Sequence, residues 1–492
     1  MLSIITFFPL IGVLILLFLK DAAVIRRVTL MVMLVDFALT IPLVRWFDRT
    51  THEMQFVEKF SWIPEWNVHY YMGVDGISVL FVFLTAALGW ICVLCSWTAV
   101  EKKVKEFMIA LLVIQTAMIG VFCALDFVLF YLFWEAMLIP MFLIIGVWGG
   151  DNRIYSAIKF FLYTLVGSVS MLVGIIALYF AGGETFEIPL LMDARYSFAL
   201  QSMVFIAFFL AFAIKVPMFP FHTWLPDAHV QAPTAGSVLL AGILLKMGAY
   251  GFLRFSLPMF PDASHYFAVP IIVLSIVAII YGAFLALAQS DLKKLIAYSS
   301  VSHMGFITLG LFLFNKNGIE GGILQMFNHG ITTSALFLCA GMVYERTHTR
   351  DISAYGWGAR KMPIYALFLF IFSLASLGFP GTNGFIGELL ILFGAYEENI
   401  LYVPLLIFGI VLGAAYMLWL FERFAYGKNG HHEEGHGRGH ISDIDAREFL
   451  VFAFLAVFVF WVGLQPMSFL GVMHVSVEHL ITQINGTMIA GH

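Results

Sequence analysis

Long apolar segments recur along the whole chain, separated by short polar loops, and they decide what the chain can fold into. A helix rises about 1.5 Å per residue, so crossing a hydrocarbon core of about 30 Å takes roughly 20 mainly apolar residues. The sequence contains about fourteen such segments, which account for nearly all of its 492 residues. Charged residues make up only 12% of the chain, against about 25% in typical soluble domains. An all-α membrane protein is therefore predicted. No segment is long or polar enough for a nucleotide-binding fold or an iron–sulfur cluster.

The helix boundaries follow from the polar residues that flank each apolar segment. To within several residues, the expected helices are 2–19, 28–46, 76–98, 107–123, 126–148, 155–181, 199–220, 232–254, 268–287, 292–314, 319–344, 362–393, 401–421 and 448–468. The first segment has no basic region before it and is followed by Lys20, which predicts a retained helix rather than a cleaved signal peptide.

Basic residues are shared unevenly between the two sets of alternate loops. One set carries Lys20, Arg26, Arg27, Lys102, Lys103, Lys105, Arg153, Lys293, Lys294, Arg346, Arg350, Arg360, Lys361, Arg423, Lys428, Arg438 and Arg447. The other set carries Arg45, Arg49, Lys59, Arg195, Arg254 and Lys316. Because cytoplasmic loops are enriched in Lys and Arg, we expect the first set to be cytoplasmic and both termini to lie on the outer side.

Two of the expected helices are interrupted at corresponding positions, the seventh at Pro217 and Pro220 and the twelfth at Pro380 and Gly381. An odd number of helices per repeat places the second copy upside down in the membrane, and paired broken helices point to an ion pathway. The pattern predicts two inverted five-helix repeats. The expected divisions are 1–106 with three helices, 107–254 as the first repeat, 268–421 as the second, and 422–492 with a His-rich cytoplasmic loop, the fourteenth helix and a tail.

Ionisable side chains lie inside several expected helices, where a charge is costly. The set that stands out is Glu135, Lys215, Lys246, His303, His329 and Glu388. At about 1.5 Å per residue from the nearest loop, four of them come out roughly 15–20 Å deep, near the midplane. Burial favours the neutral form of a lysine, whereas a carboxylate about 4 Å away favours the ammonium by about 4 kcal/mol at an effective dielectric of about 20. A row of acid, amine and imidazole groups therefore indicates lateral proton transfer, switched by movement of Glu135 relative to Lys215.

Structural roles remain open for some of these residues. Glu135 is also compatible with a hydrogen bond between helices, and His303 and His329 with satisfied core histidines. Asp36 and Lys159 are expected near helix ends or the membrane interface, where a lysine can extend its ammonium into water.

Cysteine and histidine clusters give weaker signals. Cys92 and Cys95 have CxxC spacing, but two further ligands are missing, so we expect buried thiols here and at Cys123 and Cys339. The segment 431–440 contains His431, His432, His436 and His440, and its glycines favour a solvated cytoplasmic loop over a metal site.

Several ordered segments resemble the antiporter-like membrane subunits of respiratory complex I, a proton-pumping NADH–quinone oxidoreductase. They include Phe-Ala-Ile-Lys-Val-Pro (212–217), His-Thr-Trp-Leu-Pro-Asp-Ala-His (222–229), Leu-Leu-Lys-Met-Gly-Ala-Tyr-Gly (244–251), Phe-Trp-Glu-Ala-Met-Leu-Ile-Pro (133–140), Ala-Tyr-Ser-Ser-Val-Ser-His-Met-Gly (297–305), Phe-Asn-His-Gly (327–330) and Gly-Phe-Pro-Gly-Thr-Asn-Gly-Phe-Ile-Gly-Glu (378–388). The resemblance covers essentially the whole chain. The glutamate at 388 and the end of the chain shortly after the fourteenth helix favour the branch that lacks a long lateral helix.

The resemblance carries implications for the site and its setting. It implies that Glu135 and Lys215 form the pair of one half-channel, that Lys246 is a central relay with His303 and His329, and that Glu388 connects to the outer side. It also implies a bacterial inner (plasma) membrane, other membrane subunits as partners, and no nucleic acid. Flavin, iron–sulfur clusters and quinone would belong to partner subunits, so this chain would do no redox chemistry itself.

Three other functions compete with proton translocation in such a complex. A subunit of a multi-subunit cation/proton antiporter would share the broken helices and lysines, although Glu388 disfavours it. A membrane-bound hydrogenase subunit is a close variant. A purely structural scaffold would not need a row of costly buried charges.

Overall fold

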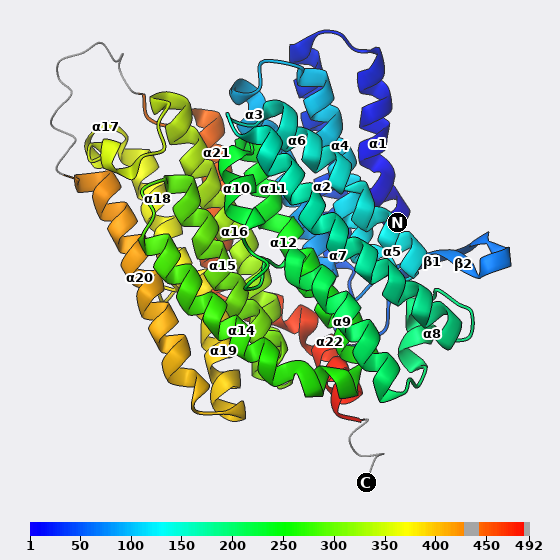
Figure 1. Cartoon of the computed structure of the whole chain (residues 1–492). Helices are drawn as coiled ribbons and strands as arrows, with labels where there is room; N and C mark the ends of the chain where they lie inside the picture. Colours follow the sequence, from blue (N-terminus) through cyan, green and yellow to red (C-terminus); the bar gives the residue numbers. More distant parts are fainter. Residues whose placement is uncertain (428–441, 487–492) are drawn as a thin grey trace.

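The computed structural model describes residues 1–427 and 442–486, and in this part of the chain long helices run side by side as a bundle (Figure 1). The helices are α1 (Leu2–Phe18), α2 (Ala22–Arg45), α3 (Val79–Ala99), α4 (Val104–Cys123), α5 (Phe127–Ala136), α6 (Leu138–Trp148), α7 (Arg153–Ala181), α8 (Ile188–Asp193), α9 (Phe198–Lys215), α10 (Trp224–Gln231), α11 (Thr234–Leu239), α12 (Leu245–Gly251), α13 (Leu257–Met259), α14 (Pro261–Leu287), α15 (Leu292–Leu311), α16 (Lys316–Thr347), α17 (Gly358–Lys361), α18 (Pro363–Ser376), α19 (Asn383–Glu398), α20 (Tyr402–Tyr426), α21 (Ala446–Leu464) and α22 (Met467–Gly486). The strands β1 (Gln55–Ile63) and β2 (Val68–Val74) pair antiparallel as a hairpin.

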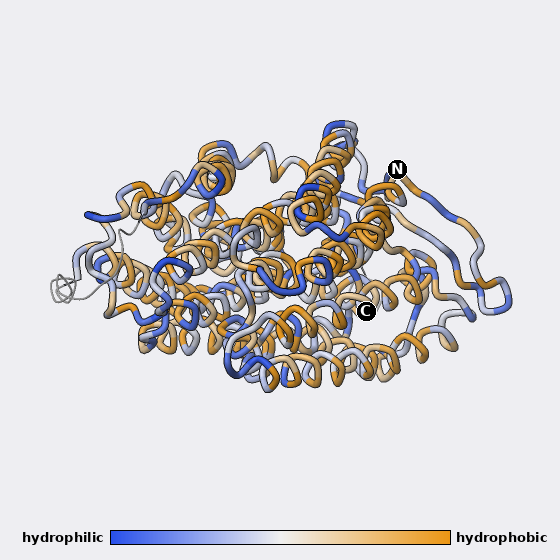
Figure 2. The backbone as a smooth tube through the Cα atoms, turned by 90° about the horizontal axis from the view of Figure 1, so that it is seen from above, coloured by the Kyte–Doolittle hydropathy of each residue, from blue (hydrophilic) through white to orange (hydrophobic). Residues whose placement is uncertain are grey.

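The all-helical membrane class is confirmed. Eleven helices among the described residues are long and apolar enough to cross a membrane, and α1 and α18 are shorter apolar helices. The exact number of fourteen crossings stays a prediction. Figure 2 shows apolar segments throughout the helices, with hydrophilic segments mainly in the connections.

Several helices begin at a side chain that caps their free backbone N–H groups. Asp21 accepts from Val24 N at the start of α2, and Asp126 accepts from Val128 N and Leu129 N at the start of α5. Asp291 and Asn315 do the same for α15 and α16, and Asp445 forms a capping box with Glu448 at α21. These caps fix where the polar loops end.

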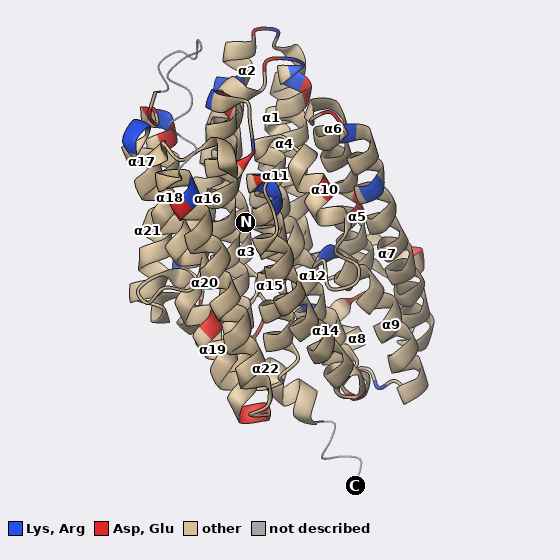
Figure 3. Cartoon of the chain, turned by 60° about the vertical axis from the view of Figure 1, so that its left-hand side comes forward, with Lys and Arg blue, Asp and Glu red and all other residues tan. Residues whose placement is uncertain are grey.

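The loops meet in two groups, one at each end of the bundle. At the end that we call the basic end, the contacts are Arg26–Val100 O, Trp148–Lys102 O, Gly150 N–Gln231 O, Lys293–Ala232 O and Leu292 N–Arg350 O. At the opposite, hairpin end they are Lys59–Glu187, Arg254–Asp75, Gln201–Asp262, Gly76 N–Ser476 and Asn315–Gly394 O. Lys and Arg gather mainly at the basic end (Figure 3). The two loop sets separated by charge in the sequence are therefore also separated in space.

Both predicted helix breaks are present, and they run in opposite directions. α9 starts at the hairpin end, where Gln201 bonds Asp262, and stops at Lys215 before α10 continues to the basic end. α18 starts at the basic end, where Ile364 N donates to Asp443, and stops at Ser376 before α19 continues to the hairpin end. Opposite directions at equivalent breaks are what an inverted repeat requires.

Some elements were not predicted. The sequence gives no expectation for the hairpin, for the short helices α8 and α10, or for α22, which packs on α16 after the last apolar segment. The segment expected as one helix over 126–148 is divided at Met137 into α5 and α6.

A buried ion pair closes the hairpin end. Arg254 donates to Asp75 Oδ1 at 2.5 Å and to the Tyr250 hydroxyl at 3.1 Å, while Asp75 also accepts from the backbone of Ile77 and Ser78 ahead of α3. Both charged side chains are less than a tenth exposed. The pair joins the helix α11–α13 region to α3.

Candidate functional site

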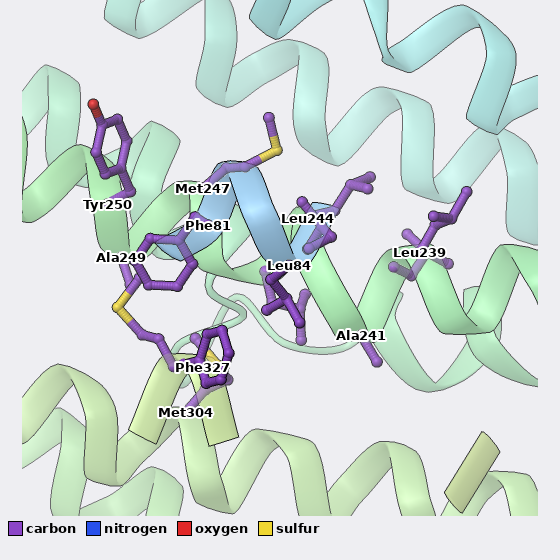
Figure 4. Close-up of a cluster of buried hydrophobic side chains, with 14 of the residues drawn as sticks. Phe81, Leu84, Leu239, Ala241, Leu244, Met247, Ala249, Tyr250, Met304 and Phe327 are labelled. Carbon is purple, nitrogen blue, oxygen red and sulfur yellow. The ribbon is translucent and has the colours of Figure 1, made fainter. Parts of the chain in front are cut away.

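Every residue of the central helix α12 is buried. Phe81, Leu84, Met304 and Phe327, from three other helices, surround it in a dense apolar cluster (Figure 4). Two short π-helical segments, 240–244 and 252–256, flank α12. Such segments are frequent at functional sites because they re-aim side chains and free backbone groups.

Lys246 on α12 has no exposed surface and reaches two partners. Its Nζ lies 2.6 Å from His329 Nδ1 on α16 and also donates to the carbonyl of Ala241, within the first π-helical segment. The His329 ring is 3% exposed, and its Nε2 has no hydrogen-bond partner in the part of the chain that the structure describes. One nitrogen of this imidazole is therefore engaged by the lysine and the other is free.

The contacts continue from His329 to Glu388. The rings of His329 and His303 lie 5.7 Å apart, centroid to centroid, and His303 Nδ1 lies 3.4 Å from Glu388 Oε1 on α19. His303 Nε2 faces the Ser376 hydroxyl at 3.3 Å and the Tyr416 hydroxyl at 3.5 Å. We call Lys246, His329, His303 and Glu388 the central row.

Neutral polar side chains support the row. Gln325 Nε2 donates to Glu388 Oε1 at 3.3 Å, and Asn328 Nδ2 donates to the carbonyl of Asn383 at 2.7 Å, just after the second helix break. A cavity of about 10 Å³ lies between His303, His329 and these amides. That volume is about enough for one water molecule, which needs polar partners of this kind.

Lys215 lies at the end of α9, at the first helix break. It is 2% exposed, its Nζ has no hydrogen-bond partner within residues 1–427 and 442–486, and it sits 5.1 Å from the centroid of the Trp134 ring. Glu135 Oε1 is likewise buried without a partner among those residues, and its carboxylate is close enough to act electrostatically on Lys215. The two side chains are neighbours without an ion pair within 4.0 Å.

Glycine allows α9 and α12 to touch at this point. A Cβ on Gly248 would lie 2.8 Å from the carbonyl oxygen of Phe212 and 2.9 Å from Val216 N. The backbones of the two helices that carry Lys215 and Lys246 are therefore in direct contact.

Two buried groups near the row were not predicted as site residues. His229 on α10 is fully buried and stacks on Phe337 at 4.4 Å, and neither ring nitrogen has a partner in the described chain. Lys293, assigned by sequence to a loop, is 5% exposed and donates to the carbonyl of Ala232 at 2.9 Å. Lys293 lines a cavity of about 680 Å³ that opens at the basic end. His229 could have been singled out from the sequence, because it is the second histidine of the segment 222–229 that carries the family resemblance.

Several residues outside the central row were also singled out from the sequence. Asp36 was expected near a helix end or interface, and this is wrong: it has no exposed surface, because it packs between helices and accepts from Gln115 at 3.1 Å. Lys159 is partly exposed and pairs with Asp227 at 2.7 Å. The four cysteines are free thiols, with all but Cys95 fully buried. The segment 431–440 lies outside the described residues.

Known proteins resemble this chain over nearly its full length. The family model described as NADH:quinone oxidoreductase/Mrp antiporter, transmembrane, matches residues 124–413. NADH-quinone oxidoreductase subunit M of Rhodobacter capsulatus is 48% identical, over 98% of this chain and 96% of that protein. NADH-ubiquinone oxidoreductase chain 4 of Marchantia polymorpha is 47% identical, over 96% and 95%. A chain in the structure of respiratory complex I from Thermus thermophilus with bound NADH superposes with a TM-score of 0.88 at 31% identity, over 98% of this chain and all of that one.

Proposed function

The chain belongs to the NADH:quinone oxidoreductase/Mrp antiporter transmembrane family, in the branch of subunit M, and from this we propose how its buried charges move protons. It is a proton-translocating membrane subunit of NADH-quinone oxidoreductase. Its relatives favour this function over the antiporter and hydrogenase alternatives.

The observation that carries the proposal is the buried central row. Lys246 Nζ lies 2.6 Å from His329 Nδ1, the centroids of the His329 and His303 rings lie 5.7 Å apart, and His303 Nδ1 lies 3.4 Å from Glu388 Oε1. Two imidazoles therefore lie between an amine and a carboxylate. An imidazole accepts a proton at one nitrogen and releases one at the other, so the free Nε2 of His329 suits it to pass protons between Lys246 and His303. A water molecule in the cavity beside the two rings would bridge the longest step.

In the proposed path, Lys215 and Glu135 form the half-channel that loads the row. Water enters the cavity of about 680 Å³ at the basic end, which we place on the cytoplasmic side, and Lys293 and His229 extend this access toward Lys246. Glu388 passes protons toward the hairpin end, on the outer side. Because Lys215 Nζ and Glu135 Oε1 lack hydrogen-bond partners in the described chain, a small shift between them changes the charge that each prefers.

The family also indicates the partners of the chain and the membrane in which it acts. Other subunits of the complex are partners of this chain, and we propose that neighbouring antiporter-like subunits are among them. Oxidation of NADH and reduction of quinone would take place on flavin and iron–sulfur clusters in partner subunits. The chain would act in a bacterial inner membrane, as one proton path of a translocase.

The test uses the assembled complex with Lys215→Ala or Glu135→Gln. We expect slower proton translocation and, through coupling, slower quinone reduction, with normal assembly. Full proton pumping together with full quinone reduction would contradict the assigned roles.

A further inference from the structure

A groove on the outside of the bundle has no role in the proton path. It has a volume of about 520 Å³ and lies between α2, α3, α21 and α22, in the half of the bundle nearer the hairpin end. Ile41 and Trp461 on its rim are 49% and 45% exposed, so the groove opens to the surroundings of the helices.

An unbroken series of aromatic rings builds its wall. Phe37 packs on Phe83 at 5.3 Å, Phe83 on Phe458 at 5.9 Å, Phe458 on Trp461 at 5.7 Å, and Trp461 on Phe469 at 5.3 Å, centroid to centroid. The groove is therefore apolar and preformed, which suits a hydrocarbon chain.

Two arginines stand at the hairpin end of this groove. Arg45 ends α2 and Arg49 follows in the next turn, and both line the groove and are exposed. Neither guanidinium has a hydrogen bond or ion pair with any residue the structure describes. The hydroxyl of Ser468, on the opposite wall, is also without a described partner.

We propose that the groove binds one anionic phospholipid, with its acyl chains along the aromatic wall and its phosphate between Arg45 and Arg49. The guanidinium fork matches a phosphate in geometry and charge. Trp461 lines the groove close to the C-terminal end of α21, and tryptophan is enriched at the level of lipid headgroups. A helix of another subunit would fill the apolar wall equally well, but it would leave two arginines without an anion unless it supplied acids of its own.

The test compares lipids on the whole chain within its complex. The purified complex is delipidated and titrated with phosphatidylglycerol or phosphatidylcholine, and native mass spectrometry counts the lipids on the ejected subunit. The variants are the pair Arg45→Gln and Arg49→Gln, the groove-filling Ile41→Trp, and the control Arg195→Gln, an exposed arginine of the same end without a described partner.

We expect the wild-type chain and the control to retain phosphatidylglycerol at least tenfold more tightly than phosphatidylcholine. The double variant should lose this preference, and the groove-filling variant should lose one bound lipid of either kind. Equal retention of the two lipids by the wild-type chain, or an unchanged preference in the double variant, would overturn the proposal. So would a cross-link from Ile41→Cys to another subunit, which would identify a protein occupant.

Discussion

At the residue scale, the contacts of the central row divide into one short contact and several longer ones. Lys246 and His329 lie 2.6 Å apart, whereas His303 lies 3.3–3.5 Å from each of its polar neighbours. A short contact is ready for proton transfer, and longer ones tighten only when charge or water moves. The region around His303 is therefore where we place the adjustable part of the path.

Gln325 offers a test of that adjustable part. Gln325→Leu removes the donor to Glu388 Oε1 and the acceptor for Asn328, leaving buried polar groups unpaired at a cost of about 1–3 kcal/mol. Because that cost falls on the transfer step, we expect proton translocation to slow by about fivefold to a hundredfold. The measurement is the initial rate of vesicle acidification. Gln289→Leu, which removes only a local bond to Leu285 near the basic end, is the control and should leave the rate unchanged.

Sequence reasoning could select charged residues of the site but not their neutral partners. A lysine or glutamate inside an apolar helix stands out because its burial is costly. Gln325, Asn328 and Tyr416 do not, since neutral polar side chains are ordinary in membrane helices and only the fold brings them to His303 and Glu388. Lys293 was counted with the basic loops although it falls in the first turn of the expected helix 292–314, where only packing decides exposure.

At the element scale, the contact between α9 and α12 holds the two buried lysines in register. Gly248→Ala would place a methyl group 2.8–2.9 Å from the backbone of Phe212 and Val216, and backbone cannot move aside as a side chain can. Overpacking of this kind costs about 1–3 kcal/mol. We expect a lower thermal midpoint of the complex and slower proton translocation. In Gly146→Ala the nearest atom is 3.6 Å away, so that variant should match the wild type; equal behaviour of the two variants would contradict this account.

The buried ion pair between Arg254 and Asp75 leads to a second prediction, about how strongly α3 is held to the α11–α13 region. Asp75→Ala leaves a buried guanidinium unpaired and removes acceptors ahead of α3, at a cost of about 3–5 kcal/mol. Thermal unfolding followed by tryptophan fluorescence should show a clearly lower thermal midpoint. Glu478→Gln removes an exposed charge that faces Lys316 and His474 and should change the thermal midpoint little. A loss no larger for Asp75→Ala than for Glu478→Gln would show that the pair does not join α3 to the α11–α13 region.

Helix breaks were predictable as elements because proline removes a backbone donor and blocks the preceding turn. The π-helical segments around Lys246 were not, since their sequences read as ordinary helix. The strands and α22 were missed because none of them is a long continuous apolar run: β1 contains Glu58 and Lys59, β2 is short, and α22 contains several polar residues.

At the scale of the whole molecule, the orientation of the chain in the membrane stays a prediction that labelling can test. Glu101→Cys lies at the basic end and Glu65→Cys at the tip of the hairpin, and both positions are exposed. The native thiols of Cys92, Cys123 and Cys339 are buried, and both variants are made in a Cys95→Ser background because Cys95 is only partly buried. A membrane-impermeant maleimide added to intact cells should label Glu65→Cys and spare Glu101→Cys. The reverse pattern would place the basic end outside.

The central row is the proton path on which the proposed function depends. The most direct measurement is the rate of proton translocation by vesicles that contain the complex with Lys246→Ala, beside Lys294→Ala, which alters an exposed lysine. We expect at least a tenfold loss of proton translocation for Lys246→Ala and none for Lys294→Ala, because only the first removes the partner of His329. Wild-type rates of both NADH oxidation and proton translocation in Lys246→Ala would contradict it.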